Sequence, residues 1–210
     1  NAHACYIYVR GEFIREREHL QAAIDQAYDA KLVGKDNLNG WPFDIYVAHG
    51  AGAYICGEET ALLESLEGKK GQPRLKPPFP ASAGLYGSPT AVNNVETLCN
   101  VPVILRNGPA WYAALGPEKN GGPKLYCISG HVQRPGVYEA SMKITLRELI
   151  DDVAGGVRDG RALKAVIPGG SSVPILLPDQ LDIEASFDGV ARAGSLLGSA
   201  GIIVLDETTC

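Results

Sequence analysis

Three short segments of the chain hold side chains that could bind a small molecule. A glycine turn at 50–52 is followed by two adjacent carboxylates, Glu58 and Glu59. The run 73–80 sets a cation and an aromatic ring among prolines, and two adjacent amides follow at 93–94. Carboxylates accept hydrogen bonds from ribose hydroxyls, while backbone N–H groups at a helix N-terminus attract anions. Together these groups are typical of a pocket for a flat, phosphorylated cofactor whose phosphate lies away from the carboxylates.

Each segment also has a purely structural explanation. The turn 50–52 does not complete the dinucleotide fingerprint, because position 55 is isoleucine, and no Walker A sequence is present. In the first turn of an expected helix, the helix dipole stabilises a carboxylate by roughly 0.3–1 kcal/mol, which explains one of Glu58 and Glu59 better than both. Asn93 and Asn94 could cap a helix, and Cys56 could be a small buried residue.

The proline-rich run predicts how its cation and ring are presented. Prolines 77, 78 and 80 favour polyproline II, whose three residues per turn place Lys76 and Phe79 on one face. Lys76 would then suit a phosphate and Phe79 an adenine. The alternative is a strap over the core, with Phe79 packed and Lys76 in solvent.

The elements expected around these groups form an α/β pattern. Residues 5–9 and 43–47 are predicted strands, 16–32 and 58–67 predicted helices. Gly34 is expected to cap the first helix, and Leu62, Leu63 and Leu66 to be buried by the second. Residues 71–89 are expected to be a long ordered loop, and Asn93 with Glu96 a capping box for a helix that Pro102 ends or kinks.

A glycine- and proline-rich stretch at 107–123 is the candidate linker to a second domain. Beyond it, 124–130 and 136–139 are predicted to form a hairpin, and Thr145 to open a helix through a capping box, ending near Val153. Residues 165–167 and 202–205 are further predicted strands. Two strands, a helix and more strands outline a small β-grasp domain.

Composition narrows the class of protein. The 210 residues, 45% hydrophobic and 20% charged, are typical of a globular fold, and a net charge of −5 argues against a nucleic-acid partner. Five scattered cysteines without a Cys-x-x-Cys favour a reducing compartment, and the four histidines lack metal-ligand spacing. The stretch 194–205 is too short to span a bilayer. Because the chain starts without methionine, we expect it to be the middle of a longer polypeptide.

Taken in order, the segments 50–60, 66–80, 84–87 and 92–97 resemble the flavin- and NADH-binding subunit of respiratory complex I, which is the 51 kDa subunit of NADH:quinone oxidoreductase. Segments 6–13 and 128–131 share this resemblance. Related subunits occur in NAD-linked hydrogenases and formate dehydrogenases, but the form of residues 75–80 is more similar to complex I.

The resemblance implies an internal fragment with an α/β fold. Residues 1–112 would be the C-terminal part of a Rossmann-like FMN/NADH-binding domain and 113–123 a linker. Residues 124–206 would be a β-grasp, soluble-ligand-binding domain that packs between subunits, and 207–210 the start of an iron–sulfur domain.

The resemblance also implies an activity: FMN takes a hydride from NADH and passes electrons singly to iron–sulfur clusters towards quinone. No protein acid or base is needed for this transfer. By matching positions, the residues that would line FMN are Tyr54, Gly57, Glu58, Asn93, Asn94 and Thr97. Those that would hold NADH are Glu59, Lys76 and Phe79, with Phe79 stacked on adenine.

Two family features are missing from these 210 residues. They are the upstream glycine-rich loop and the downstream cysteine segment that holds a [4Fe–4S] cluster. We therefore expect this span alone neither to retain FMN nor to oxidise NADH. A non-catalytic scaffold paralogue is the competing hypothesis, and the intact Glu58, Glu59, Lys76 and Phe79 argue against it.

The family implies partners and a location as well. The partners would be a thioredoxin-like [2Fe–2S] subunit and other peripheral-arm subunits of complex I. The protein would be peripheral, without inserting into the membrane, at the cytoplasmic face of a bacterial inner membrane or in the mitochondrial matrix.

Overall fold

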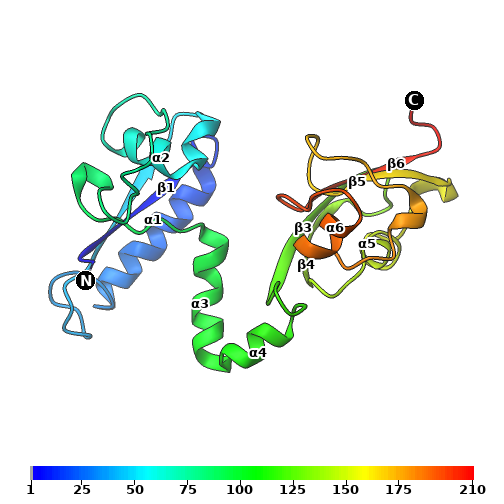
Figure 1. Cartoon of the computed structure of the whole chain (residues 1–210). Helices are drawn as coiled ribbons and strands as arrows, with labels where there is room; N and C mark the ends of the chain where they lie inside the picture. Colours follow the sequence, from blue (N-terminus) through cyan, green and yellow to red (C-terminus); the bar gives the residue numbers. More distant parts are fainter. Residues whose placement is uncertain (1) are drawn as a thin grey trace. The chain divides into compact units, whose positions relative to one another are not determined.

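The computed structural model describes residues 2–210, which divide into two compact units between Asn94 and Val95 (Figure 1). Each unit combines helices with a β-sheet, so the predicted α/β class is confirmed. The bounds predicted for the domains and their linker stay a prediction.

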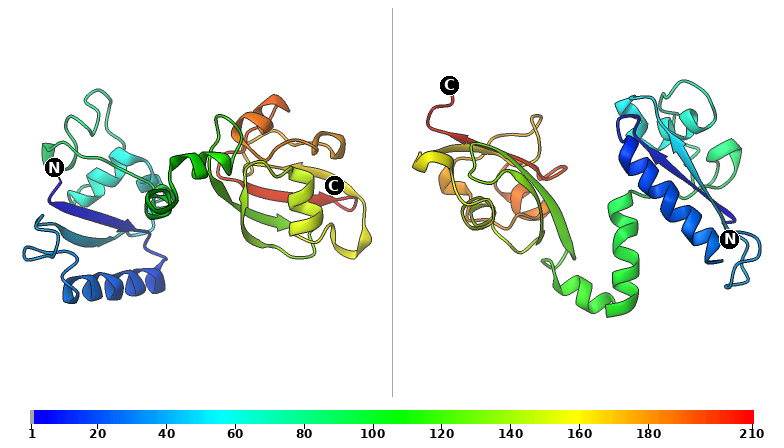
Figure 2. Two further views of the ribbon diagram at one scale, coloured as in Figure 1. Left: turned by 90° about the horizontal axis from the view of Figure 1, so that it is seen from below. Right: turned by 180° about the vertical axis from the view of Figure 1, so that it is seen from behind.

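The first unit is built on one parallel pair of strands. β1 (Ala4–Val9) pairs with β2 (Asp44–His49), from Ala4 opposite Asp44 to Val9 opposite His49. Parallel strands need a long crossover, and α1 (Ile14–Asp29) provides it, lying along the strands in Figures 1 and 2. Tyr28, near the end of α1, joins helix to sheet, because its hydroxyl donates to Asp44 and accepts from the backbone N–H of Ile45.

The end of α1 differs from the prediction. The helix stops at Asp29, and the first left-handed residue after it is Lys31, with φ 54°. Gly34 also has a positive φ, 96°, but there it pairs with Phe43 in an isolated bridge. The prediction that Gly34 caps α1 is therefore wrong: the glycine turns the chain towards β2.

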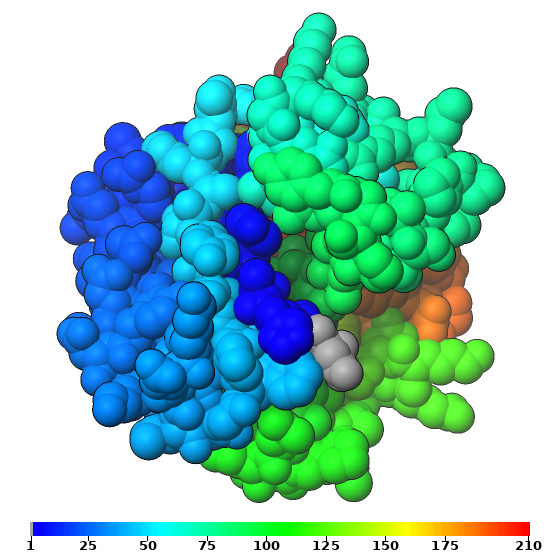
Figure 3. Space-filling view, turned by 90° about the vertical axis from the view of Figure 1, so that its left-hand side faces the viewer, coloured from blue at the N-terminus to red at the C-terminus, as the bar shows by residue number. Residues whose placement is uncertain are grey.

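A second short helix follows the turn after β2. A 3₁₀ turn (Tyr54–Gly57) leads into α2 (Glu59–Leu66). Among the three leucines predicted to be buried by α2, only Leu63 is fully buried, and Leu62 and Leu66 are partly exposed. Residues 71–90, here called the strap, form a long loop with a 3₁₀ turn at Leu85–Gly87. The strap lies on the surface of the unit, blue-green in Figure 3.

The second unit begins with two helices. α3 (Val95–Asn107) does not end at Pro102 but continues through it. α4 (Pro109–Ala114) follows at once, with proline at its first position, where the missing N–H costs nothing. α4 lies within the stretch that the sequence marks as the candidate linker.

A four-stranded sheet forms the body of the second unit. Its order is β4 (Gly136–Ser141), β3 (Pro123–Gly130), β6 (Gly201–Asp206) and β5 (Leu163–Ile167). β3 pairs antiparallel with β4 and parallel with β6, and β5 is antiparallel to β6. The first and last strands of the unit therefore lie side by side at its centre, as the β-grasp prediction requires.

The core of the second unit lies on one face of this sheet. α5 (Leu146–Glu148) runs into a π turn (Leu149–Val153), and the predicted capping box between Thr145 and Glu148 is present. α6 (Phe187–Arg192), for which the sequence gave no prediction, is capped by the Ser186 hydroxyl. The largest fully buried core side chains are Tyr126, Ile128, Leu146, Leu149, Ile150, Leu176, Leu181, Leu197 and Ile202. No helix within residues 2–210 has the length and apolar character needed to cross a membrane.

Candidate functional site

The turns that follow β1 and β2 meet at one edge of the parallel pair. Gly11, just after β1, touches the turn 50–52: a Cβ on Gly11 would lie 2.6 Å from the Gly50 carbonyl oxygen and 2.9 Å from the Gly52 nitrogen. Only glycine allows so close an approach. In open α/β sheets, ligands bind outside the carboxyl ends of the strands, which is this edge.

Glu58 acts as the N-cap of α2. Its Oε2 accepts hydrogen bonds from the backbone N–H groups of Thr60 (2.9 Å) and Ala61 (3.0 Å) and from the Thr60 hydroxyl (2.5 Å). These bonds, above all the one from the Thr60 hydroxyl, lower the pKa of Glu58 to about 2. One oxygen of this carboxylate is therefore occupied by the protein itself.

Glu59 and Lys76 form an ion pair beside this cap. The Lys76 ammonium lies 2.7 Å from Oε1 of Glu59 and 3.1 Å from Oε1 of Glu58. The two carboxylates, Glu59 foremost, raise the pKa of Lys76. The structure thus brings together three of the predicted site residues, from α2 and from the strap. A phosphate group near Lys76 would have to compete with two carboxylates for it.

The aromatic rings of the predicted site face solvent. Phe79 is 58% exposed and Tyr54 is 89% exposed. The strap alternative expected the opposite arrangement, with Phe79 packed and Lys76 in solvent, so that alternative is wrong. Polyproline II is also wrong, because it has trans bonds and the Lys76–Pro77 and Pro77–Pro78 bonds are cis.

The remaining predicted residues lie on the surfaces of their units. Gly57, Asn93 and Asn94 are exposed in the first unit, and Thr97 is exposed in the first turn of α3 in the second. Asn93 and Asn94 directly precede α3, at the point where the two units divide.

A charged network that was not predicted from the sequence attaches the strap to α2. Arg74 contacts Glu64 and Glu67, and its backbone N–H donates to the Thr60 hydroxyl. A signal was present in the sequence: Glu64 and Glu67 are three apart and share a helix face, and the following loop supplies Lys69 and Arg74.

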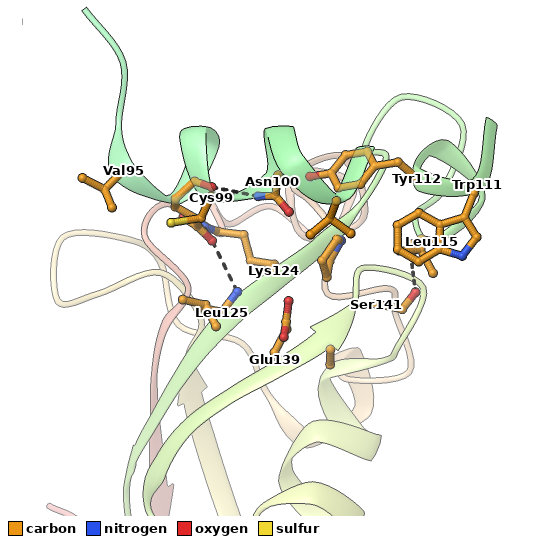
Figure 4. Close-up of a pocket in the computed structure, with 14 residues that line it drawn as sticks. Val95, Cys99, Asn100, Trp111, Tyr112, Leu115, Lys124, Leu125, Glu139 and Ser141 are labelled. Atoms are coloured by element: carbon orange, nitrogen blue, oxygen red, sulfur yellow. Dashed lines mark hydrogen bonds and ion pairs between the residues drawn. The ribbon is translucent and has the colours of Figure 1, made fainter. Parts of the chain in front are cut away.

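A separate cavity of about 610 Å³ lies within the second unit, between α3 with α4 and the ends of β3 and β4 (Figure 4). Trp111, Leu115 and Leu125 are among its lining residues. The Lys124 ammonium donates to both oxygens of Glu96, at 3.0 and 2.8 Å. Because that pair satisfies its own charges, the cavity offers mainly apolar walls, and none of the predicted site residues is among those that line it.

Comparison with known proteins agrees with this two-unit organisation. Residues 1–103 match the family model described as the Nuo51 FMN-binding domain, and residues 124–204 match the SLBB domain. The chain is 61% identical over 210 residues to the NADH-quinone oxidoreductase F-subunit numbered 1 of Rhizobium meliloti (strain 1021). It is 57% identical to the NADH-quinone oxidoreductase F-subunit of Rickettsia rickettsii (strain Sheila Smith).

These alignments cover 99% of the chain but only 48% and 50% of the two relatives, so the chain spans about half their length. Among solved structures, the chain is similar to one from an air-oxidized NAD+-reducing [NiFe]-hydrogenase. The TM-score is 0.81 at 38% identity, over 99% of this chain and 34% of that one.

Proposed function

We propose, from the premise that this chain belongs to the family of the flavin- and NADH-binding subunit of respiratory complex I, that it contributes part of a site where NADH reduces FMN. The whole polypeptide would then be an FMN-dependent NADH dehydrogenase that passes electrons through iron–sulfur clusters to quinone. The observation that carries the proposal is the cluster of Glu58, Glu59 and Lys76 beside exposed aromatic rings, in a chain 61% identical to such a subunit.

The donor set of the cluster suits the nucleotide half of this reaction. An exposed phenyl ring such as Phe79 can stack on adenine, and a carboxylate such as Glu59 can accept from ribose hydroxyls. Lys76 can exchange its carboxylate partners for the substrate phosphates. We therefore assign NADH to Glu59, Lys76 and Phe79.

We assign FMN to the other six predicted residues, Tyr54, Gly57, Glu58, Asn93, Asn94 and Thr97. When bound, the flavin supplies the two-electron to one-electron chemistry of the reaction. This chain would contribute binding and orientation, and no side chain would have to move a proton. Glu58 keeps α2 capped and Lys76 in place, so at most its Oε1 can turn to a ligand.

The rest of the assembly is part of the same proposal. We place residues 1–112 in the flavin domain, 113–123 in a linker, 124–206 in the β-grasp domain, and 207–210 at the start of a domain that holds a [4Fe–4S] cluster. A thioredoxin-like [2Fe–2S] subunit and other peripheral-arm subunits would receive the electrons, at the cytoplasmic face of a bacterial membrane or in the mitochondrial matrix.

A second candidate is the diaphorase subunit of an NAD-linked hydrogenase, which the structural similarity favours. The higher identity to quinone oxidoreductase subunits, 61% against 38%, supports complex I instead. A formate dehydrogenase subunit and a scaffold paralogue remain alternatives.

The test uses the native polypeptide in its own complex. We expect bound FMN, NADH-dependent reduction of ferricyanide, and NADH-dependent reduction of quinone. The variant Lys76→Met should raise the KM for NADH, whereas Lys164→Met, an exposed lysine on β5, should not. Hydrogen-dependent reduction of NAD+ would establish the hydrogenase alternative. A complex that holds no FMN and does not oxidise NADH would establish a scaffold.

A further inference from the structure

The side chain of Arg74 contacts three separate points of the first unit. Its Nε lies 2.5 Å from Oε1 of Glu64, its Nη2 lies 2.7 Å from Oε1 of Glu67, and its Nη1 donates to the Gly84 carbonyl oxygen at 3.1 Å. The side chains are well covered: that of Arg74 is 25% exposed and that of Glu67 only 7%. Charge-assisted hydrogen bonds of this kind are about twice as strong as neutral ones.

The backbone of the same residue is attached to the opposite end of α2. The Arg74 N–H donates to the Thr60 hydroxyl at 2.8 Å, and that hydroxyl donates to Glu58. Glu58 in turn contacts Lys76 through its other oxygen. Arg74 therefore connects the strap both to the first turn of α2 and to its C-terminal end at Glu64 and Glu67.

These contacts close a loop that contains the proposed nucleotide-binding residues. Arg74 and Gly84 form its two ends, joined by the bond from Nη1. Gly84 is held in turn against Thr90, where a Cβ on the glycine would lie 2.4 Å from Cβ of Thr90. Lys76 and Phe79 lie between these ends. Phe79 is exposed, and Lys76 is paired with the start of α2 rather than with the carboxylates that hold Arg74.

We propose that Arg74 is a positioning residue for nucleotide binding: it fixes the loop 74–84 on α2, so that Lys76 and Phe79 are held ready for the substrate. This inference rests on the proposed function of that site. Arg74 would touch neither nucleotide nor flavin and would act only through the loop. Lysine could not replace it, because one ammonium group cannot reach two carboxylates and a carbonyl in this planar arrangement.

The experiment compares Arg74→Gln and Arg74→Lys with wild type in the native complex, using NADH-dependent ferricyanide reduction. We expect Arg74→Gln to raise the KM for NADH about tenfold, because a loosened loop must be ordered again on binding. The kcat and FMN content should stay within about twofold of wild type, since loss of remote substrate binding changes KM rather than kcat. Arg74→Lys should fall between, and Glu67→Gln should act in the same direction.

Arg192→Gln is the matched control, because Arg192 is an exposed arginine of the second unit with one long ion pair to Glu184, at 3.8 Å. A wild-type KM in Arg74→Gln would overturn the inference. So would a loss of FMN in parallel with the rise in KM, which would indicate a general structural role.

Hydrogen exchange of residues 71–90 gives an independent readout that does not need activity. We expect exchange there to be about tenfold faster in Arg74→Lys, with residues 123–130 unchanged. If Arg74→Gln does not fold, Arg74→Lys and the exchanged pair Arg74→Glu with Glu67→Arg decide the question: partial recovery of a low KM in the exchanged pair supports positioning, and no recovery overturns it. If wild type fails to oxidise NADH, the proposed function fails, while the exchange result still reports whether Arg74 fixes the loop.

Discussion

Thr60 gives the sharpest test of how the site is held together. Its side chain is buried, at 1% exposure, and its hydroxyl makes two hydrogen bonds: it donates to Glu58 and accepts from the Arg74 N–H. Thr60→Val keeps the volume of the side chain and removes both bonds. Thr60→Ser is the matched control, because serine keeps the hydroxyl and loses only a methyl group.

The expected cost follows from these contacts. A hydrogen bond to a charged group contributes about 1.5–3 kcal/mol, and a buried N–H left without a partner costs about 1–3 kcal/mol. The Glu58 side chain is 32% exposed and keeps its bonds from two backbone N–H groups, so the lower part of each range applies. We expect Thr60→Val to lower the free energy of unfolding by about 3 kcal/mol and Thr60→Ser by about 1 kcal/mol, the cost of a methyl.

The pH dependence has a defined sign. The pKa of Glu58 lies at about 2 in the folded chain, against an ordinary value of 4.5, chiefly through the Thr60 hydroxyl. Because this folded-state pKa is lowered, ionised Glu58 stabilises the fold above pH 4.5, and the contribution is lost as the pH falls towards 2. In Thr60→Val the pKa rises, so the deficit should be largest above pH 4.5 and narrow towards pH 2.

The two tryptophans make the assay specific to the first unit. Trp41 lies in that unit and Trp111 in the second, so Trp111→Phe leaves Trp41 as the only tryptophan reporter. Urea unfolding of the native polypeptide, followed by Trp41 fluorescence, then measures the three proteins from about pH 3 to 7, the window set by the shift of Glu58. Equal losses in Thr60→Val and Thr60→Ser would refute the account, and so would a deficit that grows as the pH falls.

Three further predictions concern the ligands and the second unit. Glu59→Gln in the native complex removes the charge that pairs with Lys76, and we expect the Kd of NADH and of NAD+, measured by equilibrium titration, to rise about tenfold; two unchanged values would remove Glu59 from the site. Residues 1–210 purified alone should hold no FMN and not oxidise NADH by absorbance assay, and stoichiometric FMN would contradict this. Tyr126→Phe leaves the buried Ala185 carbonyl without its 2.6 Å hydrogen bond, so urea unfolding should show a loss of about 1–2 kcal/mol. Tyr138→Phe, which removes an exposed bond to the Arg134 carbonyl, should cost about 0.5 kcal/mol, and equal costs would show that burial does not decide the effect.

Elements with a local cause could be predicted from the sequence. β1 and β2 are runs of β-branched and aromatic residues, and the capping box at Thr145 depends on residues only three apart. The β-grasp outline also followed, because each of its strands is apolar enough to be found alone. The parallel pairing of β3 with β6 agrees with that outline, although the two strands are separated by the whole domain.

Features that depend on distant contacts could not be predicted. Gly34 was assigned to α1 because it follows the helix, but its conformation serves a bridge to Phe43. α3 continues through Pro102, which the local preference of proline argued against. α6 is only six residues long, too short for a periodic pattern, although the Ser186 hydroxyl caps it by accepting from the Gly189 N–H.

The pair Glu58-Glu59 shows where local reasoning about the site reaches its end. From the sequence, helix capping explained one of the two glutamates and left the second without a structural reason. The structure divides them in that way: Glu58 turns Oε2 into the first turn of α2, while Glu59 contacts the movable Lys76. A carboxylate that caps a helix cannot leave without exposing backbone N–H groups, whereas the ion pair of Glu59 can be replaced by a ligand that supplies its own hydroxyls and phosphates. The residue without a capping role is therefore the one free to bind, and Lys76, held between both, is the contact that a nucleotide would have to displace.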